Sequence, residues 1–101
     1  MSELRIKEKV LNVQYGYSNE SLLIDGSCME NQEDGMLVQV NGQCYAKKED
    51  GSRGSNVGNF SGYRRDGVMK YTTSEMTPEY GTIIWEAIQD IVSLIEADSK
   101  E

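Results

Sequence analysis

Apolar residues alternate with polar ones near the start of the chain, from Leu4 to Tyr17. A period of two residues is typical of a β-strand, because successive side chains of an extended backbone point to opposite faces. A second, shorter strand is expected from Ser21 to Ile24, and the turn-forming dipeptide Asp25-Gly26 is expected to end it. A later strand is predicted from Val68 to Thr73, which is rich in β-branched and aromatic residues.

The dipeptide Asn41-Gly42 gives the clearest local signal. It separates two apolar segments, Met36 to Val40 and Gln43 to Lys47. Both central residues of a type I′ turn have positive φ angles, and Asn-Gly is the preferred pair at these positions. The sequence therefore predicts a β-hairpin that turns at Asn41-Gly42.

The segment from Glu49 to Gly67 contains five glycines and shows almost no periodicity. Long segments of this kind in compact domains are usually functional or mobile connections. We expect residues 49–67 to form a long mobile loop, which is the first place to look for a binding site.

A helix is predicted near the end of the chain, from Thr77 to about Ala97. Thr77 is a favourable N-cap, Pro78 suits the first helical position, and the carboxylate of Glu79 suits the positive end of the helix dipole. One side of this helix carries an apolar stripe at helical spacing, which consists of Ile84, Ile88, Ile91, Val92 and Ile95. Ile83 and Leu94 flank the stripe and widen it. The widened surface is expected to form either a broad contact with the sheet or a homodimer interface.

Together these elements predict a single α+β domain over residues 1–101, with an antiparallel sheet of four or five strands covered by the C-terminal helix. A chain of 101 residues can bury one modest core, and 38% hydrophobic with 27% charged residues is a globular composition. No segment approaches the roughly 18 apolar residues of a membrane span, and the N-terminus lacks the apolar run of a signal peptide. We therefore expect a cytoplasmic protein with no membrane contact.

Histidine is absent, which removes the commonest general base and the commonest transition-metal ligand. Cys28 and Cys44 alone fall short of a four-ligand zinc site, and in the cytoplasm they are expected to be thiols. Residues 30–35 resemble a calcium loop only superficially and are expected to form a polar turn. Paired carboxylates remain the one catalytic alternative, but so short a chain leaves little scaffold for a cleft. We predict no catalytic residue, no metal and no cofactor, and hence no enzyme.

Charge is unevenly distributed along the chain, whose net charge is −7. Residues 1–43 carry three basic and seven acidic side chains, residues 44–70 carry six and three, and residues 75–101 carry one and seven. The net charge disfavours direct binding to nucleic acid. Two candidate binding sets follow. The acidic set lies on the polar side of the predicted helix and comprises Glu79, Glu86, Asp90, Glu96 and Asp98. The basic and aromatic set lies on the predicted loop and comprises Arg53, Phe60, Tyr63, Arg64 and Arg65.

In size and charge alone, the chain resembles the small acidic inhibitors that phages use against CRISPR or restriction enzymes, and the immunity proteins paired with bacterial toxins. This resemblance implies a non-enzymatic inhibitor that occupies a basic surface of a protein partner, such as a nucleic-acid-processing enzyme. Two alternatives stay open. One is a binder of a small anionic ligand, such as a nucleotide, through the arginines of the predicted loop. The other is an assembly subunit that dimerises through the helix.

Overall fold

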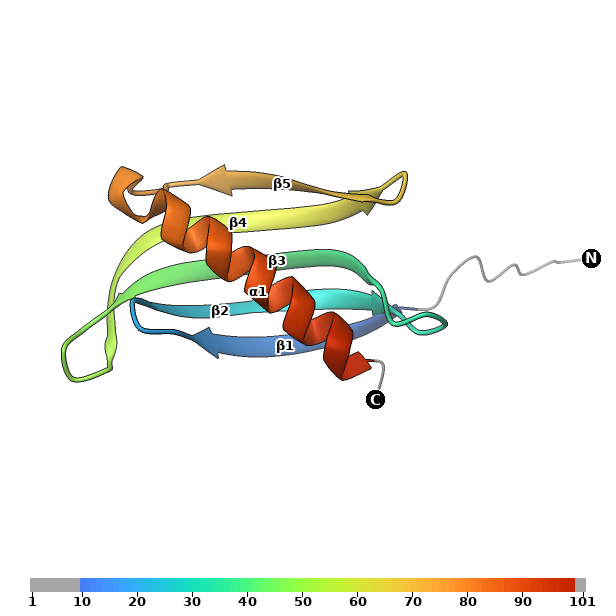
Figure 1. Cartoon of the computed structure of the whole chain (residues 1–101), viewed down its shortest axis with the longest axis horizontal. Helices are drawn as coiled ribbons and strands as arrows, with labels where there is room; N and C mark the ends of the chain where they lie inside the picture. Colours follow the sequence, from blue (N-terminus) through green and yellow to red (C-terminus); the bar gives the residue numbers. More distant parts are fainter. Residues whose placement is uncertain (1–9, 100–101) are drawn as a thin grey trace, which may run out of the picture.

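A five-stranded antiparallel sheet and one long helix make up the protein in the computed structural model, which describes residues 10–99. The strands pair in sequence order, and α1 crosses one face of the sheet diagonally, from the side of β5 to the side of β1 (Figure 1). The predicted α+β fold is confirmed. Residues 4–9 of the first predicted strand lie outside the described residues. The elements are β1 (Val10–Ser18), β2 (Leu22–Asn31), β3 (Leu37–Lys47), β4 (Arg53–Arg65), β5 (Val68–Ser74), the 3-10 helix η1 (Pro78–Tyr80) and α1 (Gly81–Ser99).

The hydrophobic core lies between α1 and the sheet face that it covers. Ile84, Ile88 and Ile91 of the predicted apolar stripe are almost completely buried there. They pack with side chains that alternate along the strands, because only every second residue of a strand faces the helix, except where register shifts near Leu37 and Val57 interrupt the alternation. The strand residues of this core are Leu22, Ile24, Cys28, Leu37, Val40, Cys44, Val57 and Phe60.

The predicted hairpin at Asn41-Gly42 is wrong. Both residues lie inside the continuous strand β3, where Gly42 pairs with Gly26 of β2 on one side and with Phe60 of β4 on the other. Neither Asn41 nor Gly42 has a positive φ angle. The two-residue turn occurs instead at Asp66-Gly67, with φ angles of 54° and 80°, between β4 and β5. Tertiary pairing thus overrides a strong local turn signal.

The predicted mobile loop over residues 49–67 is also wrong. Most of it is β4, a strand of 13 residues that pairs with β3 and β5. Similarly, Asp25-Gly26 does not end the second strand, which continues to Asn31. Glycine is uncommon inside strands, so the glycines of these segments concealed their strand character.

Three of these glycines face a ring from the neighbouring strand on the covered face. Gly26 pairs with Tyr15, Gly42 with Phe60, and Gly62 with Tyr71. A Cβ atom would lie 2.8 Å from the Tyr15 hydroxyl oxygen at Gly26, 2.5 Å from the Phe60 ring at Gly42 and 2.6 Å from the Tyr71 ring at Gly62. The absent side chains therefore make room for aromatic rings that lie across the adjacent strand, close to the sheet.

The helical region begins at the predicted place. Thr77 precedes the single 3-10 turn η1, which begins at Pro78, although the Thr77 side chain makes no capping hydrogen bond. Trp85 packs edge-on against Tyr71 of β5, with ring centroids 5.3 Å apart. Near the opposite edge of the sheet, the Tyr17 hydroxyl of β1 donates a 2.8 Å hydrogen bond to Asp90. These two contacts connect α1 to both edge strands.

Candidate functional site

The face of the sheet opposite α1 is not covered by any described element, and we call it the open face. Alternation along the strands gives it mostly uncharged polar side chains. Its middle row, read across the paired strands, is Gln14, Ser27, Asn41, Ser61 and Thr72. The two neighbouring rows are Asn12, Met29, Gln39, Tyr63 and Lys70, and Gly16, Asp25, Gln43, Asn59 and Ser74.

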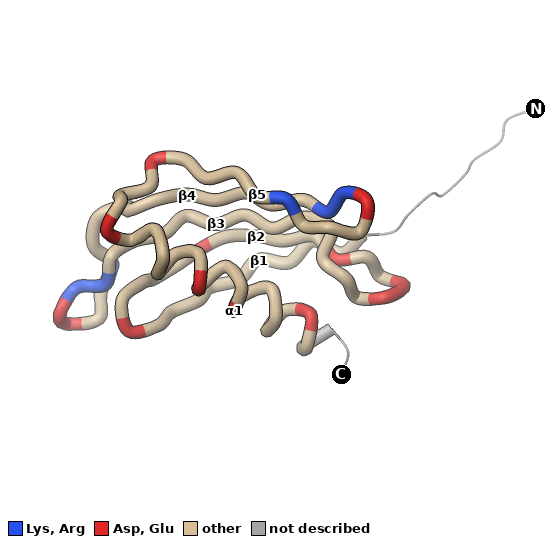
Figure 2. The backbone as a smooth tube through the Cα atoms, turned by 45° about the horizontal axis from the view of Figure 1, so that its top comes forward, with Lys and Arg blue, Asp and Glu red and all other residues tan. Residues whose placement is uncertain are grey.

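Only Asp25 and Lys70 are charged within these three rows. Figure 2 shows the same distribution, with charged residues concentrated at the turns and on α1, and few along the strands. The Asn41 side chain accepts hydrogen bonds from the Ser27 backbone N–H at 3.2 Å and from the Ser27 hydroxyl at 3.3 Å. The open face is therefore a broad array of amide and hydroxyl groups, with Tyr63 exposed among them.

One end of the open face carries a compact polar cluster around Tyr45. The Arg53 guanidinium lies over the Tyr45 ring, 4.3 Å from its centroid, and forms an ion pair with Asp25. The Tyr45 hydroxyl donates a 2.9 Å hydrogen bond to Gln43. Because Arg53 and Asp25 are both more than half exposed, their pair contributes little to stability but fixes the position of the guanidinium.

The arginines of the predicted basic set do not form one site. Arg53 and Arg65 lie at opposite ends of β4, about 40 Å apart at the rise of an extended strand. Arg64 points to the covered face, where its Nε donates a 2.7 Å hydrogen bond to the Leu37 carbonyl oxygen. An anion site made by Arg53, Arg64 and Arg65 together is therefore not assembled.

The two aromatic residues of this set lie on opposite faces of β4. Phe60, expected on an exposed loop, is a core residue with 3% of its surface accessible. Tyr63 lies on the open face with 44% of its surface accessible, close in sequence to Arg65, which is also exposed. Only Tyr63, Arg53 and Arg65 of the predicted set are thus available to a partner at the surface.

The predicted acidic set is partly engaged within the molecule. Glu79, in η1, and Glu86, on α1, are exposed, and Asp90 accepts the hydrogen bond from Tyr17. Glu96 lies 3.9 Å from Arg64 and is half-buried. Asp98 lies within α1, and its side chain falls outside the described part of the chain. Among the described side chains, the acidic surface of η1 and α1 is therefore formed mainly by Glu79, Glu86 and Asp90.

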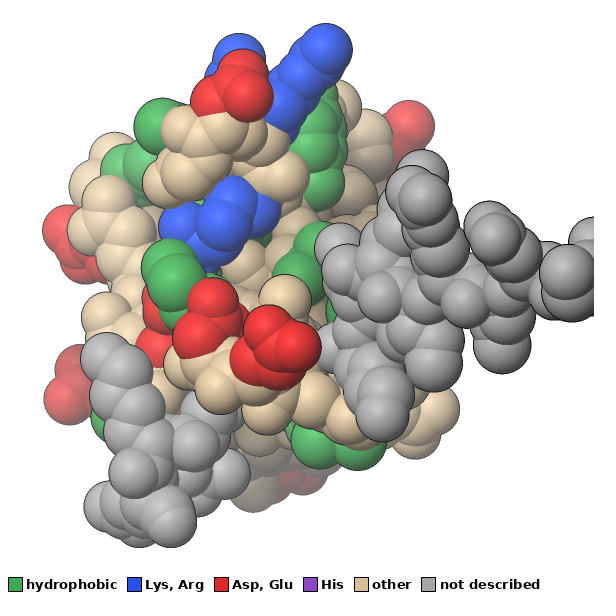
Figure 3. Space-filling view, turned by 90° about the vertical axis from the view of Figure 1, so that its right-hand side faces the viewer, with side chains coloured by type: hydrophobic (Ala, Val, Ile, Leu, Met, Phe, Trp, Pro, Cys, Tyr) green, Lys and Arg blue, Asp and Glu red, His purple; other side chains and the backbone are tan. Residues whose placement is uncertain are grey.

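The separation of charge along the sequence does not persist in space. Because β4 is extended, its basic residues are divided between the two ends of the sheet, where they meet acidic turns. Figure 3 looks at the end that carries the β2–β3 and β4–β5 turns, and it shows basic and acidic side chains close together. The uncharged rows of the open face distinguish it from both ends.

Cys28 and Cys44 are free thiols in the core. Burial raises the pKa of each thiol to about 11, and the negative charge of Glu30 adds to the effect at Cys28. Protonated, buried thiols are poor nucleophiles and poor metal ligands. Within the described residues, no cluster of metal-ligating side chains comes together. The helices in this part of the chain include none with the length and apolar character needed to cross a membrane.

The sequence matches no known protein-family model, and the chain matches no curated protein and no solved structure. Its function must therefore be inferred from its own surfaces.

Sequence reasoning did not identify the open face. The signal was present in β4, where Gly58, Phe60 and Gly62 alternate with Asn59, Ser61 and Tyr63. Glycine is uncommon inside strands, so this period of two does not by itself indicate a strand.

Proposed function

We propose that this protein is a small non-enzymatic binding protein that covers a surface of a partner protein with the open face of its sheet. The observation that carries the proposal is the composition of that face. Its three central rows are almost free of charge, and they contain Tyr63 and Met29. The centres of protein–protein interfaces are likewise depleted in charged residues and enriched in aromatic residues and methionine.

A partner with a basic surface fits the rest of the molecule. The net charge of −7 favours encounter with a positively charged protein and opposes encounter with nucleic acid. Acidic residues at the turns, among them Glu33, Asp34, Glu49 and Asp50, lie at both ends of the uncharged rows, where the basic residues of β4 accompany them. A protein that covers a basic surface used for binding nucleic acid would act as an inhibitor, as expected from the size and charge of the chain.

The proposal is tested with two matched serine variants. Ser61 is exposed at the middle of the open face, and Ser93 is exposed on the outer side of α1. Immobilised wild-type protein captures proteins from a host lysate, which are quantified in parallel with Ser61→Arg and Ser93→Arg. We expect a captured protein whose binding falls about tenfold or more with Ser61→Arg and stays near wild type with Ser93→Arg, because a charge buried at an interface centre is costly.

A charge-reversal variant on α1 distinguishes binding through the open face from binding through the acidic surface of the helix. If Glu86→Lys abolishes capture while Ser61→Arg has no effect, the acidic surface of α1 is the contact and the open-face proposal is wrong. Binding of the purified partner should also weaken as salt rises, since long-range attraction is screened. Circular dichroism confirms that each variant is folded.

A further inference from the structure

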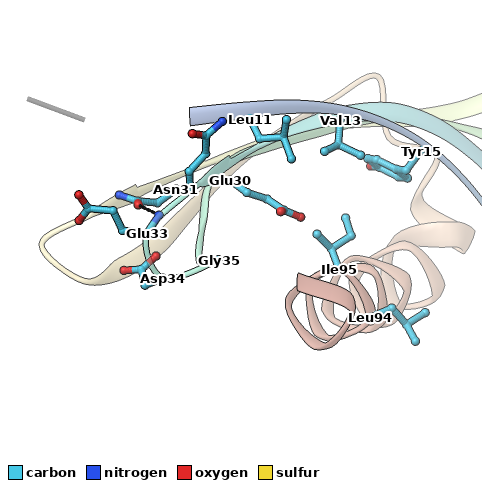
Figure 4. A pocket seen from close by; sticks show the side chains of 11 residues that line it. Leu11, Val13, Tyr15, Glu30, Asn31, Glu33, Asp34, Gly35, Leu94 and Ile95 are labelled. Carbon is cyan, nitrogen blue, oxygen red and sulfur yellow. Dashed lines mark hydrogen bonds between the residues drawn. The ribbon is translucent and has the colours of Figure 1, made fainter. Parts of the chain in front are cut away.

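A groove with a volume of about 1040 Å³ opens between the start of β1, the end of β2 and the C-terminal part of α1. Its apolar side is formed by Leu11 and Val13 of β1 and by Leu94 and Ile95 of α1 (Figure 4). Leu11 and Leu94 have 48% and 56% of their surface accessible, which is high for leucine. The groove thus leaves a contiguous apolar surface exposed to solvent.

Three acidic side chains are among the other residues that line this groove. Glu30 extends from β2 into the space between β1 and α1, and Glu33 and Asp34 lie on the β2–β3 turn at its end (Figure 4). The site therefore combines an apolar wall with negative charge. An occupant with matching chemistry carries apolar side chains together with lysine or arginine.

Strand β1, which forms one wall of the groove, is an edge strand. Among the described residues it pairs with β2 alone, so its outer edge presents unpaired backbone N–H and C=O groups. Natural edge strands are usually protected by charged residues, proline or β-bulges. Over its nine residues β1 has no charged residue and no proline, and its register with β2 is regular. The opposite edge strand, β5, carries Lys70 and is shorter, with seven residues.

We propose that the β1 edge and the adjoining groove bind an extended segment of a partner protein, which adds a sixth strand to the sheet. Backbone hydrogen bonds to β1 would hold the segment, and its alternate side chains would enter the groove. Those side chains are apolar beside Leu11 and Val13, and basic near Glu30 and the β2–β3 turn. The inference uses a different surface from the open face and does not depend on it.

Charge favours a partner segment over a second copy of this chain. Two copies would bring together molecules of charge −7 each, and the acidic groove of each would face the other copy's β1, which carries no basic residue. Like charges of this kind oppose association. A basic segment of another protein gains from the same charges.

The probe is the peptide Lys-Thr-Val-Thr-Val-Thr-Lys, in which lysine and valine share one face of an extended strand. The matched control is Glu-Thr-Val-Thr-Val-Thr-Glu. Binding is followed by NMR titration and by hydrogen exchange of the backbone amides of the full chain. We expect the lysine peptide to bind at least about fivefold more tightly than the glutamate peptide and to slow exchange of amides in Val10–Ser18.

Two variants locate the site. Leu94→Lys places a positive charge in the groove, whereas Val68→Lys makes the same change at an equally exposed residue, 58% accessible, on the opposite edge strand. Leu94→Lys should weaken binding of the lysine peptide about tenfold or more, and Val68→Lys by less than about threefold. Equal effects of the two variants, equal affinity of the two peptides, or slowed exchange in β5 instead of β1 would overturn the proposal.

Two other occupants give distinct results, and each would also overturn the assignment to a partner. If a second copy fills the site, sedimentation shows a dimer without peptide, and Leu94→Lys dissociates it. If residues 1–9 of the same chain fill the site, the peptide binds only after these residues are deleted.

Discussion

The Tyr15 hydroxyl donates a 2.6 Å hydrogen bond to the backbone carbonyl oxygen of Asn41, two strands away in the sheet. The ring reaches β3 because it passes over Gly26 of β2, its partner in the register. The same arrangement recurs where Phe60 lies over Gly42 and Tyr71 over Gly62. The covered face is thus built from pairs of a glycine and an aromatic residue, and the first predictions test these pairs.

Replacing Gly26 with alanine should destabilise the fold. The new Cβ would lie 2.0 Å from the Asn41 carbonyl oxygen and 2.8 Å from the Tyr15 hydroxyl, so the strands or the ring must move. The expected loss is about 1–3 kcal/mol or more of the free energy of unfolding, measured by urea denaturation. Gly16→Ala is the control, because its Cβ on the open face would meet Asp25 at an ordinary 3.7 Å. A similar loss in both variants would contradict the packing argument.

The hydrogen bond itself can be measured with Tyr15→Phe. This change removes the hydroxyl while keeping the ring over Gly26, and we expect a loss of about 1 kcal/mol in the free energy of unfolding. Tyr17→Phe removes the exposed bond to Asp90 and should cost less. The prediction is wrong if the Tyr17 variant loses as much stability as the Tyr15 variant.

Gly67, in the Asp66-Gly67 turn, allows the cost of backbone strain to be measured apart from side-chain contacts. Gly67 has a φ angle of 80°, and a Cβ added there would have no neighbour within 4 Å. Gly67→Ala should therefore cost about 1–2 kcal/mol through backbone strain alone. Gly67→Asn should recover part of this loss, because asparagine tolerates positive φ angles better than alanine does. Thermal unfolding ranks the three proteins, and equal melting temperatures for Ala and Asn would refute strain as the cause.

The buried thiols predict a dependence of stability on alkaline pH. Burial raises the pKa of Cys28 and Cys44 from an ordinary 9.0 to about 11. Between these values the unfolded chain loses thiol protons that the folded chain keeps, so the free energy of unfolding should fall as pH rises from about 9 to about 11. The double variant Cys28→Ala/Cys44→Ala should show a shallower fall. Its remaining slope includes Tyr15, whose hydroxyl pKa is also raised by burial.

The same thiols should react slowly with iodoacetamide at neutral pH, because the reactive thiolate is scarce and both sulfur atoms are buried. Alkylation in the native state, followed by mass spectrometry, should be much slower than in urea. Rapid native labelling of Cys28 or Cys44 would show that the core opens readily.

Much of the helix and part of the sheet were predictable, because their signals are local. The apolar stripe of α1 follows the helical period, and Ile84, Ile88 and Ile91 are buried where that period placed them. The residues of β5 favour strands, and the predicted strand from Val68 to Thr73 is confirmed. In contrast, the glycines of β4 and the Asn41-Gly42 dipeptide have a local preference for loops and turns. Their strand conformation depends on pairing with the neighbouring strands and on the rings of Phe60 and Tyr71, so residue preference alone does not predict it.

The candidate sites divide in the same way. Glu79 and Glu86 were expected on the exposed side of the helical region and are exposed there, since the helical period alone decides which side is polar. The sequence predicts one loop that carries Arg53, Phe60, Arg64 and Arg65. In the structure these residues belong to β4, which separates them along its length and between its two faces. The open face escaped prediction, because it exists only once five strands are placed in order.

The sequence alone determined that α1 is amphipathic, that imidazole is absent and that the net charge is −7, because each is a property of composition or of short-range spacing. The tertiary structure alone decided that glycines pair with aromatic rings, and that within residues 10–99 β1 pairs with β2 alone and no element covers the second face of the sheet. These features arise from the pairing of five consecutive strands and the packing of α1 on one face of their sheet, where the energy of packing exceeds the small conformational preference of any single residue.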